Sequence, residues 1–314
     1  MIKKLIILVA AIMPLLAAAQ AEAWKVHPRF VAASTQCLAD AGNKVYYLVA
    51  GNVFCYDKQT QETVALGTNS LNDLTVTKMF YNENKGYLLL AYDNSNIDII
   101  TADGRVVNIP EIKNAVVTQT KAINSVTFDD SHAFVAADFG FIVIDDSKFV
   151  VTESHYYGNK MTGAAHVGDK LIVGIDTGLK YCNFDDLREK AGSFRALTDG
   201  GKSVYLLDLE IYPIDDTHFF LNSRSSFEVG TLDGATITRT VLTPNHAVTV
   251  QRTPTGFVAC FPSINNYLTT DATGENAQLH SCNGEFISIN PHGDGTVWAL
   301  NGTGLHKQGE AGQR

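Results

Sequence analysis

The hydrophobic and polar positions of this chain follow one pattern that recurs seven times. Each copy is an apolar, strand-like run, then a polar or glycine turn, then a second short apolar run. Paired runs of this length, separated by turn residues, are typical of β-hairpins. The copies are Lys44–Tyr56, Tyr87–Ile100, His132–Ile144, Lys170–Cys182, Thr217–Gly230, Gly256–Thr269 and Gly295–Lys307.

The spacing of the copies predicts the architecture. Equivalent inner-strand residues, from Tyr46 to Val297, recur about every 42 residues, a length typical of a four-stranded propeller blade. We therefore expect an all-β fold, a β-propeller of seven blades with four antiparallel strands each. One helical turn is expected, at Asn183–Ala191, as an insertion in the fourth blade. The first blade is expected to contain strands at Gln36–Ala39, Val45–Val49, Val53–Tyr56 and Glu62–Leu66.

The beginning of the chain has the pattern of a signal peptide. Lys3 and Lys4 precede the apolar run Leu5–Leu16, which is too short to span a bilayer, and Ala19-Gln20-Ala21 is a cleavage motif. Residues 1–21 are therefore predicted to be removed during export. We expect the mature protein in the periplasm or at the cell surface of a Gram-negative bacterium.

The other end of the chain leaves the seventh blade one strand short. The propeller is expected over residues 22–307, and residues 308–314 are either a disordered tail or the point at which a longer protein is truncated. The segment Trp24–Ala32 precedes the first blade. We expect it to close the ring as the outer strand of the seventh blade, where Pro28 is tolerated because an edge strand needs fewer backbone donors.

The charge argues against nucleic acid as a partner. The formal net charge is −9, and it falls to about −11 when the two lysines of the signal peptide are removed. Nucleic-acid binding needs clustered Lys and Arg, and no such run follows residue 21. No further stretch of the sequence is long and apolar enough to predict a membrane span.

The sequence contains no catalytic motif and predicts no cofactor. It lacks C-x-x-C, H-E-x-x-H, G-x-S-x-G, a P-loop and G-x-G-x-x-G, so we expect neither a metal site nor catalytic residues. The five cysteines are interpreted as small buried hydrophobic residues, with a Cys260–Cys282 disulfide as the alternative. Four acidic pairs are interpreted as turn residues: Asp129-Asp130, Asp145-Asp146, Asp185-Asp186 and Asp215-Asp216.

Two groups of residues are candidates for binding a ligand or partner. Asp93, Asn94, Asn96 and Asp98 form a dense polar cluster on one hairpin, which could hold a cation or sugar hydroxyls. Tyr156 and Tyr157 lie near a turn and could offer a stacking surface for a sugar. For both groups the competing interpretation is structural: a hairpin turn for the first and packing for the tyrosines.

An ordered series of motifs resembles one family over Trp24–Ile109. After Trp24 and His27, the series continues with Val45-Tyr46-Tyr47, with Gly51 to Asp57, and with Leu71-Asn72-Asp73. Its most specific part is Leu88–Ile100, whose turn is Asp93-Asn94-Ser95-Asn96. These motifs are similar to those of the N-terminal β-propeller of the PorZ family, which belongs to the type IX secretion system.

The resemblance implies a non-enzymatic binding or scaffold module of the machinery that attaches exported proteins to the cell surface. The partners it implies are proteins of the attachment complex and lipopolysaccharide, and it implies no catalytic residue. Members of the family are expected to have a second propeller and a C-terminal sorting domain, for which this chain has no length. Two alternatives stay open: a periplasmic ligand-sensing propeller related to two-component regulators, which Val297–Leu305 resembles, and a propeller enzyme such as a polysaccharide lyase.

Overall fold

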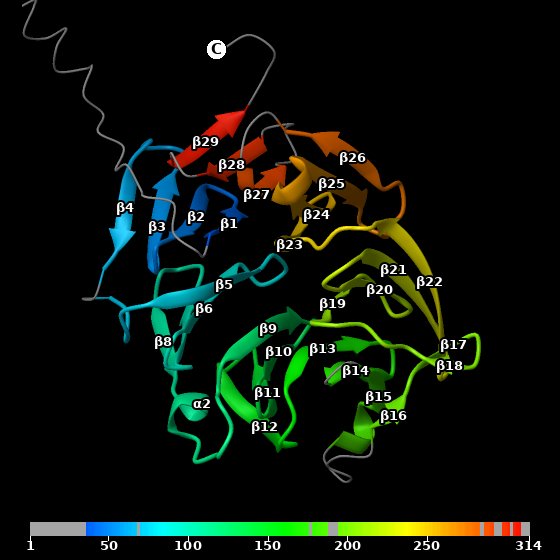
Figure 1. Cartoon of the computed structure of the whole chain (residues 1–314). Helices are drawn as coiled ribbons and strands as arrows, with labels where there is room; N and C mark the ends of the chain where they lie inside the picture. The colour runs from blue at the N-terminus through cyan, green and yellow to red at the C-terminus, as the bar shows by residue number, and fades with distance from the viewer. Residues whose placement is uncertain are drawn as a thin grey trace, which may run out of the picture.

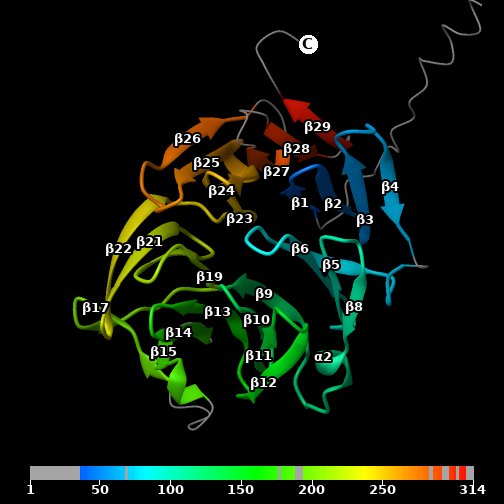
Figure 2. The ribbon, with the colours of Figure 1, turned by 180° about the vertical axis from the view of Figure 1, so that it is seen from behind.

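The computed structural model describes residues 36–67, 70–175, 178–187, 194–282, 286–291, 297–301 and 304–308. Their strands form seven small sheets around a common centre, which Figures 1 and 2 show from opposite sides. The predicted all-β propeller fold is therefore confirmed. The predicted signal peptide, the closing strand Trp24–Ala32 and residues 309–314 lie outside the described residues.

The first three sheets each consist of four consecutive antiparallel strands. All four strands predicted for the first blade are present, each paired with its neighbour along the chain. The strands are β1 Gln36–Ala41, β2 Lys44–Val49, β3 Asn52–Asp57 and β4 Thr63–Leu66; β5 Val76–Asn82, β6 Tyr87–Tyr92, β7 Ile97–Ile100 and β8 Val106–Ile109; β9 Ile123–Phe128, β10 His132–Ala137, β11 Gly140–Asp145 and β12 Val150–Tyr156.

The fourth and sixth sheets repeat this order, and three described strands form the seventh. In every sheet except the fifth the strands follow one another in sequence, so each sheet forms from local contacts. The strands are β13 Met161–Val167, β14 Lys170–Ile175, β15 Gly178–Asn183 and β16 Arg195–Ala196; β23 Thr249–Thr253, β24 Gly256–Phe261, β25 Asn266–Asp271 and β26 Gln278–Ser281; β27 Phe286–Pro291, β28 Val297–Asn301 and β29 Gly304–Gln308.

The fifth sheet departs from the expected four antiparallel strands, because it contains six strands in the order β18-β17-β22-β21-β20-β19. A short hairpin turns at Gly200 and Gly201, which both have positive φ, and joins β22 through a parallel pairing of Thr198 with Thr236. Leu197 and Val204 anchor the hairpin in the core beside this sheet. The strands are β17 Thr198–Asp199, β18 Lys202–Ser203, β19 Glu210–Pro213, β20 His218–Asn222, β21 Phe227–Asp233 and β22 Thr236–Thr243.

Helical structure is limited to three short segments of the described chain. The expected turn in the fourth blade is present as the 3-10 helix η1 (Asp185–Leu187), and a second 3-10 helix, η2, spans Pro262–Ile264. The α-helix α2 (Glu111–Asn114) was not predicted, because four residues are too few to show a helical period. Its Ile112 is buried in the core between the second and third sheets.

Hydrophobic clusters fill the spaces between neighbouring sheets. Phe134 of the third sheet packs with Leu171 of the fourth, and Phe220 of the fifth meets Phe257 of the sixth edge-on, with ring centroids 5.2 Å apart. Each large side chain buried in this way contributes about 1.5–3 kcal/mol to folding. The interfaces between sheets therefore hold the ring together.

The first and seventh sheets meet at a seam that closes the ring. Leu38 and Tyr47 of the first sheet share a cluster with Trp298 and Leu300 of the seventh. The Trp298 and Tyr56 rings lie 5.2 Å apart. The described residues of this seam come from the first and seventh sheets, and the role of Trp24–Ala32 in closure stays a prediction.

The five cysteines are free thiols. Cys260 and Cys282, the pair considered for a disulfide, are both buried in the cluster between the sixth and seventh sheets. Burial raises the pKa of Cys182 to about 11, and it raises the pKa of Cys37 to a similar value even though hydrogen bonding opposes the shift. The cysteines therefore behave as small apolar residues.

Candidate binding cavity at the centre of the ring

A cavity of about 980 Å³ lies at the centre of the ring. Residues of the innermost strands β1, β5, β9, β19 and β23 line it. Each of these strands is the edge strand of its sheet that faces the centre (Figure 1). The volume lies at the upper end of the range for ligand pockets, about 300–1,000 Å³.

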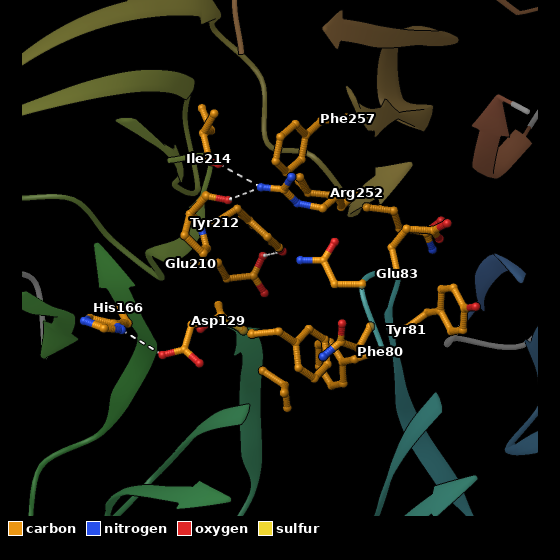
Figure 3. A pocket seen from close by; sticks show the side chains of 18 of the residues that line it. Phe80, Tyr81, Glu83, Asp129, His166, Glu210, Tyr212, Ile214, Arg252 and Phe257 are labelled. Carbon is orange, nitrogen blue, oxygen red and sulfur yellow. Dashed lines mark hydrogen bonds and ion pairs between the residues drawn. The ribbon is translucent and has the colours of Figure 1, made fainter. Parts of the chain in front are cut away.

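The wall of the cavity is aromatic as well as polar, as Figure 3 shows. Phe80 and Tyr81 come from β5, Phe128 from β9, Tyr212 from β19 and Phe257 from β24. The Tyr212 hydroxyl donates a hydrogen bond to Glu210 Oε2 at 2.8 Å. Burial raises the pKa of Tyr81 to about 12, so its hydroxyl stays neutral.

Five carboxylates surround one end of the cavity, which we call the acidic mouth. They lie on three turns, each of which follows an innermost strand. Asp130, Asp215 and Asp216 are exposed, whereas Glu83 and Asp129 are partly buried. The mouth comprises Glu83 of the β5–β6 turn, Asp129 and Asp130 of the β9–β10 turn, and Asp215 and Asp216 of the β19–β20 turn.

The turn of the fourth sheet packs directly against this mouth. Gly168, in the β13–β14 turn, has a φ of +59°, and a Cβ at this position would lie 2.5 Å from the Asp216 carbonyl oxygen. A larger residue would be strained and would displace the Asp216 backbone. Glycine at position 168 therefore lets the turns of two neighbouring sheets pack together at the mouth.

Asp129 is held in place by two histidines and by its own turn. The His166 Nδ1 atom lies 2.7 Å from Asp129 Oδ2, and the amides of Ser131 and His132 donate to Asp129 Oδ1. Burial opposes ionisation, but the hydrogen bonds outweigh it and hold the pKa of Asp129 below its ordinary value. The His166 ring stacks on Phe184, with centroids 4.0 Å apart.

Two cations also line the cavity, and both make contacts with backbone carbonyls. The Arg252 Nη2 atom donates to the Ile214 carbonyl oxygen at 2.8 Å, and the guanidinium lies 4.6 Å from the Phe257 ring centroid (Figure 3). Lys78, near the start of β5, donates to the Asn124 carbonyl oxygen. Burial lowers the pKa of both groups.

Carboxylates outnumber these cations in the described lining. Glu210 adds a sixth carboxylate to the five of the acidic mouth, against Lys78 and Arg252. Because the cavity walls have a low dielectric constant, this excess of carboxylates over cations produces a negative potential inside the cavity. The cavity therefore favours cationic or hydrogen-donating ligands.

The predicted polar cluster lies away from this cavity, and its residues separate into two kinds. Asp93 and Asn94 are exposed in the β6–β7 turn, whereas Asn96 and Asp98 are almost completely buried. The Asn94 Oδ1 atom accepts a hydrogen bond from the Asn96 amide at 3.0 Å. The cluster was predicted to lie on a hairpin, and β6 and β7 do form an antiparallel pair there.

The two buried members belong to a connected network, which we call the second-blade cluster: Asn72, Asp73, Asn96, Asp98 and Asn108. Asp98 accepts hydrogen bonds from the Asn72 amide and side chain at 2.8 and 2.9 Å. It also accepts from the Tyr92 hydroxyl at 2.6 Å and from Asn108 Nδ2 at 2.9 Å. Protein donors thus occupy the Asp98 carboxylate, so this arrangement holds the second blade together.

The two predicted tyrosines do not form one surface. Tyr156, at the end of β12, is 55% exposed and stacks on Phe139 at 5.1 Å. Tyr157 packs among Phe141 and Phe194, and burial raises its pKa to about 12. Tyr156 is exposed whereas Tyr157 is partly buried, so a stacking site there would depend mainly on one ring.

The four aspartates of the acidic mouth were interpreted as turn residues, and they do lie in turns; Glu83 was not singled out from the sequence. Asp215 Oδ1, for example, accepts from the amides of Thr217 and His218 at 2.8 Å. The available signal was that Asp129-Asp130 and Asp215-Asp216 each precede the second strand of a repeat. In a propeller, the turns that follow the innermost strands all lie at the same end of the central cavity.

Within the described ranges, no group of three or more His, Cys, Asp or Glu side chains is placed to hold a metal ion. A search of the same residues for a helix long and apolar enough to cross a membrane finds none.

Comparison with solved structures relates the fold to several propellers. The most informative is PorZ of Porphyromonas gingivalis, described as an essential bacterial surface component of the type IX secretion system: the TM-score is 0.71, the identity is 19%, and the match covers 88% of this chain. This chain spans 37% of the length of that PorZ chain. No protein with a curated function matches the sequence.

Other propellers share the fold at lower similarity. The extracellular domain of a hybrid two-component system of B. thetaiotaomicron matches with a TM-score of 0.60 and 9% identity, over 89% of this chain and 40% of the other. Hydrazine synthase of Kuenenia stuttgartiensis matches with a TM-score of 0.58 and 12% identity, over 92% and 98%. At such identities only the architecture is shared.

The family comparison is more specific, because it depends on sequence. Residues 45–186 match the model of the PorZ N-terminal β-propeller domain of the type IX secretion system. The match covers the first three sheets from Val45 onwards and most of the fourth. The predicted resemblance is thus confirmed, and this chain is a β-propeller similar to the N-terminal propeller of PorZ.

Proposed function

We propose that this chain is a non-enzymatic binding module of the type IX secretion machinery, acting in the cell envelope. The observation that carries the proposal is the family match over residues 45–186. The structural likeness to PorZ across 88% of the chain supports it. We propose that the chain is exported by the signal peptide predicted at residues 1–21.

The propeller suits a scaffold because its working surface is rigid. The interfaces between sheets are packed with large side chains, and the seam around Trp298 joins the first and seventh sheets. The cavity is built from innermost strands and the turns that follow them, so its shape is set by the ring. A preformed site of this kind binds a partner with little ordering cost.

The charge of the cavity bears on the choice of partner. Lipopolysaccharide is anionic, and six carboxylates against two cations oppose its entry into the central cavity. We therefore propose that a protein of the attachment complex is the partner of the cavity. Lipopolysaccharide would have to use another surface of the chain.

A sensory role is the second candidate, favoured by the likeness to the two-component ectodomain. In that case the cavity would hold a small ligand whose binding is passed to a signalling partner. The shared architecture alone does not distinguish the two roles.

In vivo crosslinking tests the proposal. The chain, tagged at its chromosomal locus, is crosslinked in intact cells, purified and analysed by mass spectrometry, with an equally tagged exported protein as the control. Specific enrichment of type IX attachment proteins is expected, together with release of normally attached cargo into the medium when the gene is deleted. Normal cargo attachment in the deletion strain, with a signalling protein as the crosslinked partner, would favour the sensory role instead.

A further inference from the structure

We infer that the acidic mouth and the central cavity bind a basic segment of a partner protein, with lysine or arginine side chains entering the ring. The inference extends the proposed function, because it names the chemistry of the partner. Four features carry it: the unbalanced charge, the aromatic wall, a buried acceptor and the size of the cavity.

The charge at the mouth is in excess and accessible. Asp130, Asp215 and Asp216 are exposed. Arg252 interacts electrostatically with Asp130 and Asp215 and offsets part of this charge. His218 Nδ1 lies 2.9 Å from Asp215 Oδ2, and Lys78 lies about 16 Å along β5 from Glu83, so the carboxylates of the mouth still outnumber the nearby cations. A cation that approaches this end of the ring is therefore attracted.

The aromatic wall is suited to the same ligand. Arg252 already lies over the face of Phe257, which is a cation–π contact inside the cavity. Phe80, Tyr81 and Phe128 contribute further rings to the lining. Guanidinium and ammonium groups bind such faces more strongly when water is excluded.

A buried acceptor in the lining points to a ligand that donates hydrogen bonds. The side-chain oxygen of Gln251, on β23, is buried and has no hydrogen-bond partner among the described residues. An unsatisfied buried acceptor costs about 1–3 kcal/mol. A lysine or arginine side chain carries hydrogen-bond donors only, at the end of a long apolar stem, so it supplies the kind of group that this oxygen lacks.

The size of the cavity sets the length of the segment. A volume of about 980 Å³ is far larger than one side chain needs. An extended tripeptide measures roughly 10 Å along its backbone and fits a space of this size. We therefore assign a short basic stretch of a partner, rather than a single residue, to the cavity.

Isothermal titration calorimetry with a blocked trilysine peptide tests the assignment. The chain as exported is titrated with trilysine, with triglutamine and with triglutamate, each acetylated and amidated, at about 50 and 500 mM salt. We expect trilysine to bind, triglutamine and triglutamate to bind at least about tenfold more weakly, and the trilysine affinity to fall at high salt.

Two variants with equal loss of charge make the test specific. Asp130→Asn/Asp215→Asn/Asp216→Asn removes three charges from the mouth, and Glu62→Gln/Glu111→Gln/Glu275→Gln removes three exposed charges outside the lining. The first is expected to weaken trilysine binding about tenfold, and the second less than about twofold. Melting curves confirm that both variants fold.

Three results would overturn the inference. Equal effects of the two variants would mean that only the overall charge matters, and tighter binding of triglutamate would mean that Lys78 and Arg252 dominate the cavity. Tighter binding of spermidine than of trilysine would assign the mouth to a polyamine. If trilysine fails to bind while attachment proteins are still crosslinked in cells, the inference is wrong and the proposed function stands.

Discussion

Two groups of acidic side chains in this protein look alike in the sequence and differ in the structure. Asp98 of the second-blade cluster closely follows the β6–β7 turn, whereas the carboxylates of the acidic mouth lie on three turns that follow innermost strands. Asp98, in the former, is buried and accepts four hydrogen bonds from the protein. Asp130, Asp215 and Asp216, in the latter, are exposed beside a cavity.

The difference teaches that the number of polar residues in a turn does not identify a binding site. Side chains of the second-blade cluster satisfy one another, so the cluster contributes to stability. The acidic mouth gathers like charges from three turns, which favours a ligand of opposite charge. The contrast predicts that substitutions in the cluster reduce stability, whereas substitutions at the mouth change binding.

The largest effect is expected from Asp98→Ala. It removes the acceptor of four hydrogen bonds and leaves the buried Tyr92 hydroxyl without its acceptor, so the free energy of unfolding should fall by about 3 kcal/mol or more. Urea unfolding followed by circular dichroism measures it. Asp93→Ala, on the same hairpin but exposed, is the control and should change stability by less than about 0.5 kcal/mol. Similar losses of stability in Asp98→Ala and Asp93→Ala would contradict the structural role assigned to the buried carboxylate.

Asp129 shares features of both groups, because it belongs to the acidic mouth but is partly buried and hydrogen-bonded to the protein. Its contribution to stability should therefore depend on pH. Because its pKa is lowered in the folded protein, the ionised carboxylate stabilises the fold fully above the ordinary pKa of about 3.9, and this contribution is lost as the pH falls through the lowered value. Asp129→Asn should therefore cost about 1–2 kcal/mol at pH 5 and progressively less towards pH 3. Unfolding curves across this range measure the difference. A cost that is constant with pH would contradict the assignment.

A smaller effect is expected from Tyr92→Phe. The substitution removes one donor to Asp98 and leaves the others in place, so it should cost about 1 kcal/mol. Tyr156→Phe removes a hydroxyl from an exposed ring and should leave the melting temperature nearly unchanged. If Tyr92→Phe also left the melting temperature unchanged, the hydrogen bond from Tyr92 to Asp98 would contribute less to stability than its geometry indicates.

The smallest effect on stability is expected at the mouth. Asp130→Asn/Asp215→Asn/Asp216→Asn should leave the free energy of unfolding within about 1 kcal/mol of the wild type, because the residues are exposed and asparagine retains an acceptor for the turn amides. Thermal unfolding at low salt is the measurement. A large loss would mean that these carboxylates, like Asp98, maintain the structure.

The sequence predicts the blades well because their information is local. Alternating apolar runs and turn residues specify each hairpin, and the first blade has its strands where they were expected. The β17–β18 hairpin was missed because it is two short strands around Gly200 and Gly201, with too few residues to show a period.

The cavity could not be predicted in the same way, because it depends on how sheets are placed around the centre. The sequence indicates that Asp129 and Asp215 lie in turns, but not that these turns face the same space. Conversely, Asp98 is a strand residue whose partners Asn72 and Asn108 come from other parts of the second repeat. Only the fold shows that these two residues, together with Tyr92, donate four hydrogen bonds to the carboxylate.

The seam between the first and seventh sheets has a consequence for the order of folding. The six other interfaces join sheets that are neighbours in sequence, whereas Leu38 and Trp298 meet across about 260 residues. Closing so long a loop costs more chain entropy than any other step, so the sheets should stack one after another into an open arc before the seam forms. An arrested or mechanically stretched molecule is then expected to open first at Trp298, and to expose the two sheet faces that the closed ring hides.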